Sequence, residues 1–262
     1  MRIIFSVLLA AMPLLSWAPD RGRQVMDETL KALGGEKFRS VEDRVESGRA
    51  YSFYRERLSG LSVAKIYTRY LTPPEPPTPD FFGVRERQAF GKNEDYGYLF
   101  NELGGWDVTF RGARPMPEDI LARYRDTTRR NIFYILRERL GEPGMVFDYR
   151  GTDIIENQPV EIVDITDAEN RTVTVYINRT TRLPVRQVYI RRDPKTGVHQ
   201  EITYFSKYRD VGGGVMWPFA IERERDGEKI YQMFADAVTI NSGLKDDLFT
   251  LSADTKLLKP AR

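Results

Sequence analysis

The stretch that decides the fold runs from Tyr204 to Leu251 and reads YFSKYRDVGGGVMWPFAIERERDGEKIYQMFADAVTINSGLKDDLFTL. Two alternating segments, residues 215–225 and 228–240, lie on either side of Asp226-Gly227. This dipeptide is typical of tight hairpin turns, because both of its residues tolerate a positive φ. The pattern therefore predicts an antiparallel hairpin near the end of the chain.

The same kind of alternation extends toward the N-terminus. Further strands are expected at 145–152, 158–166, 171–178, 183–192 and 200–208, and earlier ones at 41–54, 61–71, 82–90 and 95–101. In the first two of these, the apolar residues share one parity, namely Val41, Val45, Tyr51 and Phe53, then Leu61, Val63, Tyr67 and Leu71. Ten to twelve strands in meander order predict a mainly β protein whose curved antiparallel sheet forms an incomplete barrel.

Two helices accompany the predicted strands. Residues 21–33 place apolar side chains on one helical face and end at Gly34-Gly35, a good helix stop. Residues 117–140 carry an apolar stripe from Ile120 to Leu140, and Gly141 and Pro143 end the pattern. We expect this second segment to form one helix of about 36 Å, long enough to lie across the mouth of the barrel.

The N-terminus has the pattern of an export signal. Arg2 precedes an apolar run from Ile3 to Trp17, which suits a signal peptide and is short for a membrane span. We therefore expect a signal segment at 1–18, with cleavage near Ala18, and one folded domain at 19–262. The chain has no cysteine, so it has neither a disulfide nor a lipid-modified cysteine.

Residues capable of chemistry are few. His199 is the only histidine, and it follows a turn at Thr196-Gly197, where a solvated role is expected. With one histidine and no cysteine, ordinary zinc sites are excluded, and we expect no metal and no cofactor. Glu222 and Glu224 share one strand face about 7 Å apart, but neighbouring arginines favour a salt-bridged surface over paired catalytic acids. The sequence predicts no catalytic residue and hence no enzyme.

The charge balance gives no reason to expect nucleic acid as a partner. The chain has 40 basic and 38 acidic side chains, a net charge of +2. The arginines of the 117–140 segment are interspersed with Glu118, Asp119, Asp126 and Glu138, as on an ordinary solvated helix face. An anionic membrane surface or a protein partner remains open for this face.

Several short motifs occur in the order found in one known family. Gly34-Gly35 ends the first helix, Gly48-Arg49 opens a strand, and Asn178 to Pro184 form a turn between strands. Trp217-Pro218 and Ile240-Asn241 complete the set. In this order the chain, over about 20–251, resembles the LolA/LolB-like outer-membrane lipoprotein carrier (lipoprotein-sorting) superfamily.

The resemblance implies a fold and a ligand class. Members of the superfamily fold as an incomplete antiparallel barrel with helices across its mouth, and the best-known ones carry lipoprotein acyl chains through the periplasm. The resemblance thus implies a periplasmic carrier of lipoproteins or other lipids, working with inner- or outer-membrane partner proteins. An envelope sensor or assembly factor on the same fold, recognising protein partners, is the alternative.

Large apolar residues are the candidates for ligand contact. They are Trp106, Phe110, Trp217 and Phe219 on the predicted strands, and Ile132, Phe133 and Leu136 on the helical stripe. Aromatic alternation is also what any β core shows, so packing and ligand contact are both open readings for the strand residues.

Export is directly testable. N-terminal sequencing of protein from the soluble cell-envelope fraction should find a chain that begins near Pro19 or Asp20, because the apolar run would direct it across the membrane. Recovery of the full-length chain in the cytosol would contradict this expectation.

Overall fold

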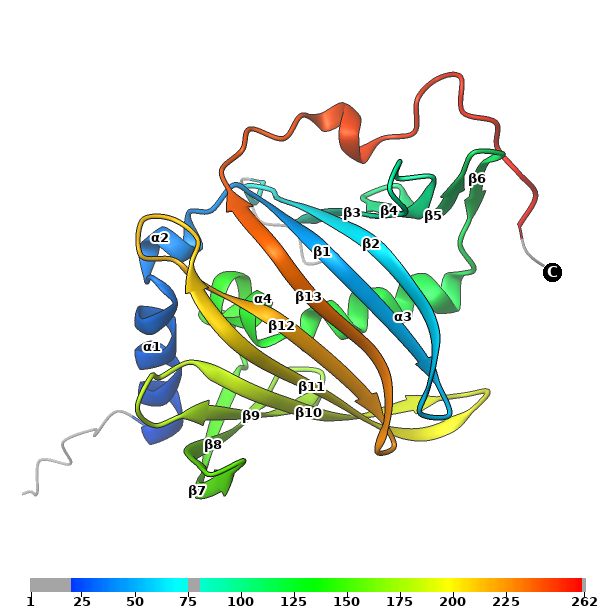
Figure 1. The fold of residues 1–262 in the computed structure, drawn as a ribbon. Helices are drawn as coiled ribbons and strands as arrows, with labels where there is room; N and C mark the ends of the chain where they lie inside the picture. Colours follow the sequence, from blue (N-terminus) through cyan, green and yellow to red (C-terminus); the bar gives the residue numbers. More distant parts are fainter. Residues whose placement is uncertain (1–19, 75–80, 261–262) are drawn as a thin grey trace, which may run out of the picture.

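A computed structural model describes residues 20–74 and 81–260, and the predicted signal segment, 1–18, lies outside these ranges. Within them, thirteen strands form a single antiparallel sheet (Figure 1). The strands are β1 (Asp43–Tyr54), β2 (Arg57–Tyr70), β3 (Val84–Phe90), β4 (Tyr96–Asn101), β5 (Gly104–Thr109), β6 (Gly112–Pro115), β7 (Val146–Ile155), β8 (Gln158–Thr166), β9 (Thr172–Asn178), β10 (Pro184–Asp193), β11 (Gly197–Asp210), β12 (Met216–Arg225) and β13 (Glu228–Ile240).

The sheet is an open, strongly curved meander. Its order is β6-β5-β4-β3-β2-β1-β13-β12-β11-β10-β9-β8-β7, so only the β1–β13 pair joins strands distant in sequence. Strands β6 and β7 stay at opposite edges, which confirms the predicted incomplete barrel. The short β5–β6 hairpin adds two strands to those expected. Asp226 and Gly227 have φ values of 54° and 82°, as the predicted hairpin turn requires.

The inward faces of β1 and β2 differ from what their apolar parity indicated. Within the two strands the apolar odd positions face outward, and Leu61 and Val63 are more than half exposed, whereas Val41, which precedes β1, is buried in the core. Several even positions, including Arg44, Glu46 and Ala64, are buried on the concave face instead. The reason is the register: Arg44 pairs with Thr68 and Ala64 with Gly48, so one parity of both strands lies under the helices.

Helix α1 (Arg21–Leu33) has the bounds that the sequence predicts. Asp20 caps its N-terminus by accepting a hydrogen bond from the Gly22 N–H, and Gly34, at φ 122°, ends it. Its buried face contains Val25, Met26 and Leu33, and it packs on β7 and β8. A Cβ at Gly22 would lie 2.1 Å from the Phe147 carbonyl oxygen, so this contact requires glycine. The short α2 (Glu36–Arg39) follows directly.

The second helical segment is not one helix, and that prediction was wrong. It consists of α3 (Glu118–Arg129), α4 (Ile132–Tyr134) and a π-helical turn, η1 (Ile135–Arg139). Asn131 interrupts it with an extended backbone, and its side chain accepts a hydrogen bond from the Phe133 N–H. The buried Gln187 side chain of β10 accepts from the Ile132 N–H at 3.0 Å. These two acceptors replace the helical carbonyls, so the break is built from polar contacts that periodicity does not reveal.

The C-terminal segment, 241–260, runs along the outside of β3 and β4 to β6 (Figure 1). The Asp43 carboxylate accepts from the N–H groups of Ser242, Gly243 and Leu244, which fixes its start. A 3₁₀ turn, η2 (Asp246–Phe249), buries Phe249 completely. The segment then pairs beside β6, where the Ala113 N–H donates to Lys256 and the Leu258 N–H donates to Ala113. This edge of the sheet is therefore covered by the chain itself.

The helix break should contribute measurably to stability. Replacing Asn131→Ala removes the acceptor for the Phe133 N–H and should lower the free energy of unfolding by about 1 kcal/mol. Asn131→Asp keeps an acceptor oxygen and is the matched control. Denaturant unfolding of both variants measures the difference, and an alanine variant as stable as wild type would contradict the capping role.

Candidate functional site

The candidate site is the concave face of the sheet, together with the helical cover that crosses it. We use "helical cover" for residues Glu118–Arg139, that is α3, α4 and η1. In Figure 1 α3 runs behind β1 and β2, toward the β5–β6 hairpin at its N-terminal end and α4 at its other end. We call strands β1–β6 the first wing of the open sheet and strands β7–β13 the second wing. The cover spans the distance between the two wings.

Aromatic stacking attaches α3 to the first wing. Tyr124 stacks on Phe100 of β4, with ring centroids 3.7 Å apart and planes 6° apart. Phe82 lies 6.0 Å from Tyr124 and 5.6 Å from Tyr134, whose hydroxyl donates to the Phe82 carbonyl. Leu121 packs close to Gly105 of β5. These contacts are apolar and insensitive to salt.

Polar contacts attach α3 to the second wing. The Arg123 guanidinium lies 2.6 Å from the Asp193 carboxylate, and the Lys195 ammonium lies 2.5 Å from Asp119. The Lys195–Asp119 pair is solvent-exposed, and such pairs contribute at most about 1 kcal/mol. The Tyr189 hydroxyl adds a hydrogen bond to Thr127 at 3.3 Å. This side of the cover is therefore the easier one to release.

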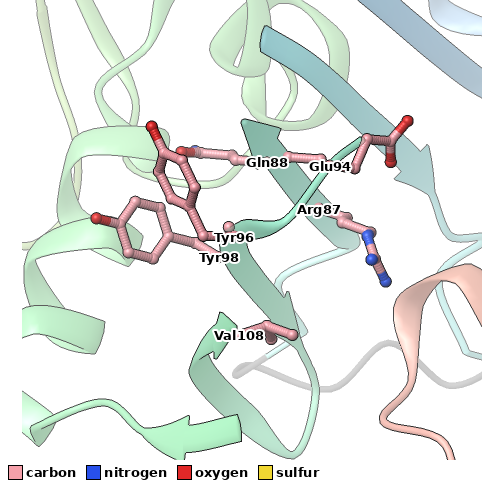
Figure 2. Close-up of a pocket in the computed structure, with 8 residues that line it drawn as sticks. Arg87, Gln88, Glu94, Tyr96, Tyr98 and Val108 are labelled. Atoms are coloured by element: carbon pink, nitrogen blue, oxygen red, sulfur yellow. The ribbon is translucent and has the colours of Figure 1, made fainter. Parts of the chain in front are cut away.

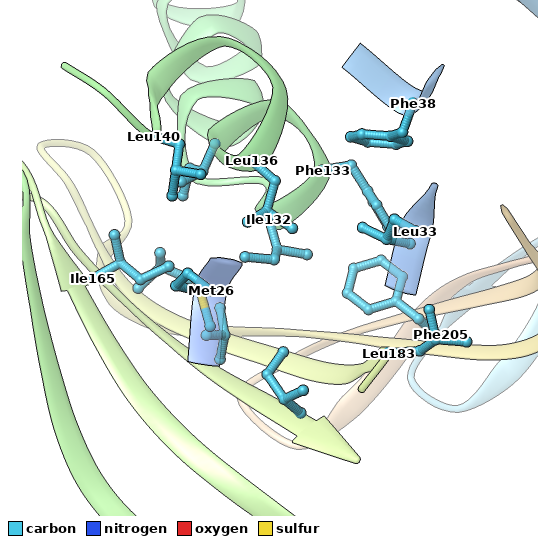
Figure 3. Packing of buried hydrophobic residues seen from close by; sticks show 14 of the residues in the cluster. Met26, Leu33, Phe38, Ile132, Phe133, Leu136, Leu140, Ile165, Leu183 and Phe205 are labelled. Atoms are coloured by element: carbon cyan, nitrogen blue, oxygen red, sulfur yellow. The ribbon is translucent and has the colours of Figure 1, made fainter. Parts of the chain in front are cut away.

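One half of the concave face is apolar and filled. Here α4 and η1 bury Ile132, Phe133 and Leu136 against α1 and the strands (Figure 3). The Phe133 ring lies 4.7 Å from Trp217 and 5.0 Å from Phe205. In Figure 3, Ile132 and Leu136 point from the cover toward Met26 and Ile165. The expected hollow is occupied at this end by the chain's own helical segment.

Five of the seven candidate contact residues meet in this cluster. Ile132, Phe133 and Leu136 come from the cover, and Trp217 and Phe219 come from β12; all five are buried. The other two lie elsewhere. Trp106 is half-buried on β5, between Gly105 and Asp107, so it takes the parity opposite to Gly105, which faces Leu121 of α3. Phe110 is 84% exposed at the β5–β6 turn.

The other half of the concave face is polar. The buried Arg44 of β1 donates to Glu46 at 2.8 Å and to Thr68 at 3.1 Å, and it also donates to the Tyr70 hydroxyl. Its guanidinium lies 3.8 Å from the centre of the Trp217 ring. A cation over an indole face is a favourable arrangement, so Arg44 forms the boundary between the two halves.

Glu86 is the carboxylate closest to the α3 attachment. It pairs with Phe100 of β4 on one side and with Thr68 of β2 on the other, and Gln88 donates to its side chain at 2.6 Å. Burial raises the pKa of Glu86, although the Gln88 amide, Arg44 and Arg223 oppose the shift. The buried Tyr124 hydroxyl has no hydrogen-bond partner among the described residues. Burial, and next the Glu86 charge, raises the pKa of this tyrosine.

Tyrosines continue the polar half toward the hairpin tips. Burial raises the pKa of Tyr231 on β13 to about 12, and Arg223, opposite it on β12, is exposed. In Figure 2, Gln88, Tyr96 and Tyr98 project to one side of β3 and β4, and Arg87 projects to the other. Tyr98 is 40% exposed. This half can therefore offer hydroxyl, amide and charged groups to the polar part of a ligand.

Sequence reasoning missed this polar half. A signal was present, because Arg44 and Glu46 occupy every second position of one strand and Glu86 and Gln88 occupy every second position of another. Charges at alternate positions normally mark a solvated face. They are inward here because the helical cover and the C-terminal segment lie on opposite sides of β3 and β4, an arrangement that a single sequence does not display.

The residues considered for catalysis are distant from this face. His199 lies on the β11 hairpin, 2.7 Å from Asp226 and 2.8 Å from the Thr196 hydroxyl. Glu222 pairs with Lys229 at 2.6 Å. Among the described residues, no group of three or more potential His, Cys, Asp or Glu ligands could hold a metal ion. No helix in 20–74 or 81–260 is long and apolar enough to cross a membrane.

The raised pKa of Glu86 leads to a prediction about stability. Ionisation of Glu86 is disfavoured in the folded state. The free energy of unfolding therefore falls as the pH rises from 4.5, the ordinary pKa of this carboxyl group, through its pKa in the folded protein. Glu86→Gln should therefore raise the melting temperature at pH 7, and the gain should shrink as pH falls below about 4.5. Thermal unfolding from pH 3.5 to 7.5 tests this, with exposed Glu102→Gln as control. An equal effect at all pH values would contradict the assignment.

Comparisons with known proteins bear on the fold. No protein-family model matches the sequence, and no curated protein matches it. Among solved structures, a DUF1329 family protein from Desulfovibrio piger is 14% identical in sequence and has a TM-score of 0.58. The superposition includes 88% of this chain and 98% of the Desulfovibrio chain. A putative outer membrane lipoprotein-sorting protein domain from Vibrio parahaemolyticus is 10% identical, with a TM-score of 0.58, covering 88% and 96%. The resemblance found in the sequence is thus confirmed at the level of the fold.

Proposed function

We propose that the protein is a periplasmic binding or carrier protein for lipoproteins or other acylated ligands, and that it holds them on the concave face of the open sheet. The observation that carries the proposal is the two-part character of this face: one half is apolar and the other is polar, under a single helical cover. An acylated ligand likewise has an apolar part, the acyl chain, and a polar part, the head to which the chain is attached. The putative outer membrane lipoprotein-sorting protein domain from Vibrio parahaemolyticus shares the fold, and this likeness supports the ligand class.

The acyl chain would take the place of α4 and η1. These elements fill the apolar half with Ile132, Phe133, Ile135 and Leu136, whose burial contributes about 6–12 kcal/mol. A chain of about 16 carbons gains roughly 12 kcal/mol on leaving water. The free energy gained by a long acyl chain therefore offsets the burial that it displaces, whereas that gained by a short chain does not. The remaining contacts would come from Trp217 and Phe219.

The helical cover has the features of a movable part. Asn131 breaks it in the middle, and a π-helical turn, an arrangement frequent at functional sites, follows at once. The attachment of its first helix, α3, to the second wing is polar and consists chiefly of two ion pairs and one hydroxyl contact. Release of that side would let the cover swing on the Tyr124–Phe100 stack, and the ligand would enter between cover and sheet.

The polar half has a role in this scheme. Glu86, Gln88 and Tyr98 would face the head of the ligand, so the site would bind an amphipathic molecule better than a hydrocarbon. Trp106 and Phe110 have no part in it, because one lies on the other parity of its strand and the other at an exposed turn. The signal segment at 1–18 would deliver the protein to the periplasm.

A reversible lock tests both ligand and cover. Because the chain has no cysteine, Asp119→Cys with Lys195→Cys provides the only two thiols. A short bis-methanethiosulfonate cross-linker, which forms one disulfide with each thiol and releases two methanesulfinate ions, should join α3 to the β10–β11 turn reversibly. The locked protein should bind a fluorescent C16 fatty acid at least about tenfold more weakly than the same variant after reduction, a difference of roughly 1.4 kcal/mol. Fluorescence titration measures both states.

The control joins two residues that make none of the contacts described between the cover and the sheet. His199→Cys with Asp226→Cys joins β11 to the β12–β13 turn, where the two side chains are 2.7 Å apart, and should leave binding unchanged. Equal binding by locked and reduced cover variants would refute the movable cover. No saturable binding in any state, with no lipid in solvent extracts of the purified protein, would refute the carrier and favour the sensor or assembly factor.

A further inference from the structure

Strands β9 and β10 separate before β10 reaches its C-terminal end. Their pairing runs only as far as Val188 and Thr174, although β10 continues to Asp193. On its other side β10 stays paired with β11 to the end, where Asp193 lies opposite Gly197. Residues 189–193 thus have a neighbouring strand on one side only within the described ranges.

Hydrogen bonds in β11 show which backbone groups face the open side. The Asp226 N–H donates to the Gln200 carbonyl at 2.9 Å, and the Gln200 N–H donates to the Asp226 side chain at 2.8 Å, so the Gln200 peptide groups point to β12. Successive residues of a strand direct these groups to opposite sides. The backbone N–H and C=O groups of Glu201 and of its partner Tyr189 therefore point toward each other. Those of Ile190 and Arg192 point away from β11.

The gap between the two strands is held open by a side chain. Arg130, at the C-terminal end of α3, donates to the Thr172 carbonyl at 3.0 Å. Continuation of the register would place Thr172 opposite Ile190, so Arg130 occupies the acceptor that the ladder would use. Asp126 fixes the Arg130 side chain at 3.0 Å, and the guanidinium lies 5.1 Å from the Tyr189 ring centre. The split is therefore a supported feature of the fold.

A cleft of about 660 Å³ lies at this split. Its walls are Asp126, Arg130, Asn170, Thr172 and Thr174 on one side, and residues 188–192 with Gln200 on the other. The five-residue edge spans about 16 Å, the length of a short extended peptide. Three arginines and one aspartate line the cleft. Arg130 pairs with Asp126 and the buried Arg191 pairs with Glu201, whereas the exposed Arg192 makes no ion pair within the described residues. An acidic side chain opposite Arg192 fits this charge.

The two outermost edges of the sheet, β6 and β7, are protected. The C-terminal segment covers β6, and β7 carries a bulge between Tyr149 and Gly151, which distorts its free edge. The 189–193 edge has neither protection. An open strand edge inside a cleft is the geometry that binds extended peptides by main-chain hydrogen bonds.

We propose that residues 189–193 of β10 form a docking site for an extended, acidic segment of a partner protein, which adds to the sheet as a strand between β10 and Thr172. Main-chain bonds to Ile190 and Arg192 hold the segment. The side chains of Ile190 and Arg192 share one strand face, so Arg192 recognises an acidic side chain on that face and the half-exposed Ile190 contacts the aliphatic part of a residue beside it. This site lies apart from the apolar half of the concave face and does not depend on lipid binding.

The first test uses a synthetic probe, the fluorescein-labelled peptide Glu-Val-Thr-Val-Glu-Val-Thr. Fluorescence anisotropy should show saturable binding, and nuclear magnetic resonance should place the largest amide shifts at Ile190 and Arg192. A version with Lys in place of Glu should bind more weakly, and a version N-methylated along its backbone should not bind. Binding of the methylated peptide equal to that of the parent, or shifts confined to other strands, would overturn the proposal.

Variants of one residue separate backbone from side-chain effects. Ile190→Pro removes an N–H that faces the cleft and leaves the β10–β11 ladder intact, so it should lower affinity for the probe at least about tenfold. Ile190→Ala retains the N–H and should stay within about threefold of wild type. Arg192→Glu should also weaken binding of the acidic probe. Thermal unfolding verifies the fold, and if the proline variant does not fold, the methylated peptide with wild-type protein decides.

Discussion

The pairing of β1 with β13 is the constraint on which the rest of the structure depends. All other strand pairs join neighbours in sequence, whereas this one places Arg44 opposite Ile240. Without it the chain would consist of two separate meanders, β1–β6 and β7–β13, each with exposed faces. Gly48 makes the contact sterically feasible: the register shifts beside it, and a Cβ there would lie 2.0 Å from the Phe234 carbonyl oxygen. Any larger residue would push the two halves apart.

Joining the two meanders creates the concave face and gives it two characters. At one end α1 and the second half of the cover fill the concavity with apolar side chains, and at the other Arg44, Glu46 and Glu86 lie inward under α3. Buried charges cost free energy unless they are paired and hydrogen-bonded. Glu46 meets this requirement through Arg44, but Glu86 has only an amide donor and the more distant arginines. That incomplete satisfaction distinguishes the polar half from a purely structural core.

The helical cover connects this face to the open edge of β10. The C-terminal end of α3 supplies Arg130, which separates β9 from β10, and the second turn of α3 supplies Arg123, which binds Asp193 at the end of β10. Movement of the cover away from the second wing would change both contacts. The proposed lipid site and the proposed peptide site therefore both contact the helical cover, although each is tested by a different ligand.

The sequence by itself determined the fold class, most of the strands, the first helix and the hairpin at Asp226-Gly227. These features follow from local alternation, turn residues and caps, which act over a few neighbouring positions. Five of the candidate residues chosen from local patterns, Ile132, Phe133, Leu136, Trp217 and Phe219, lie in one buried apolar cluster. Only the tertiary structure decided which parity of β1 and β2 faces inward, because both parities carry apolar and polar residues and the covering helices make the choice. It also decided the break at Asn131, since the Gln187 acceptor lies more than fifty positions away, and the open edge at Ile190, which exists because a side chain from α3 takes a carbonyl of β9. Contacts between distant segments set these features, and no local pattern in one sequence records them.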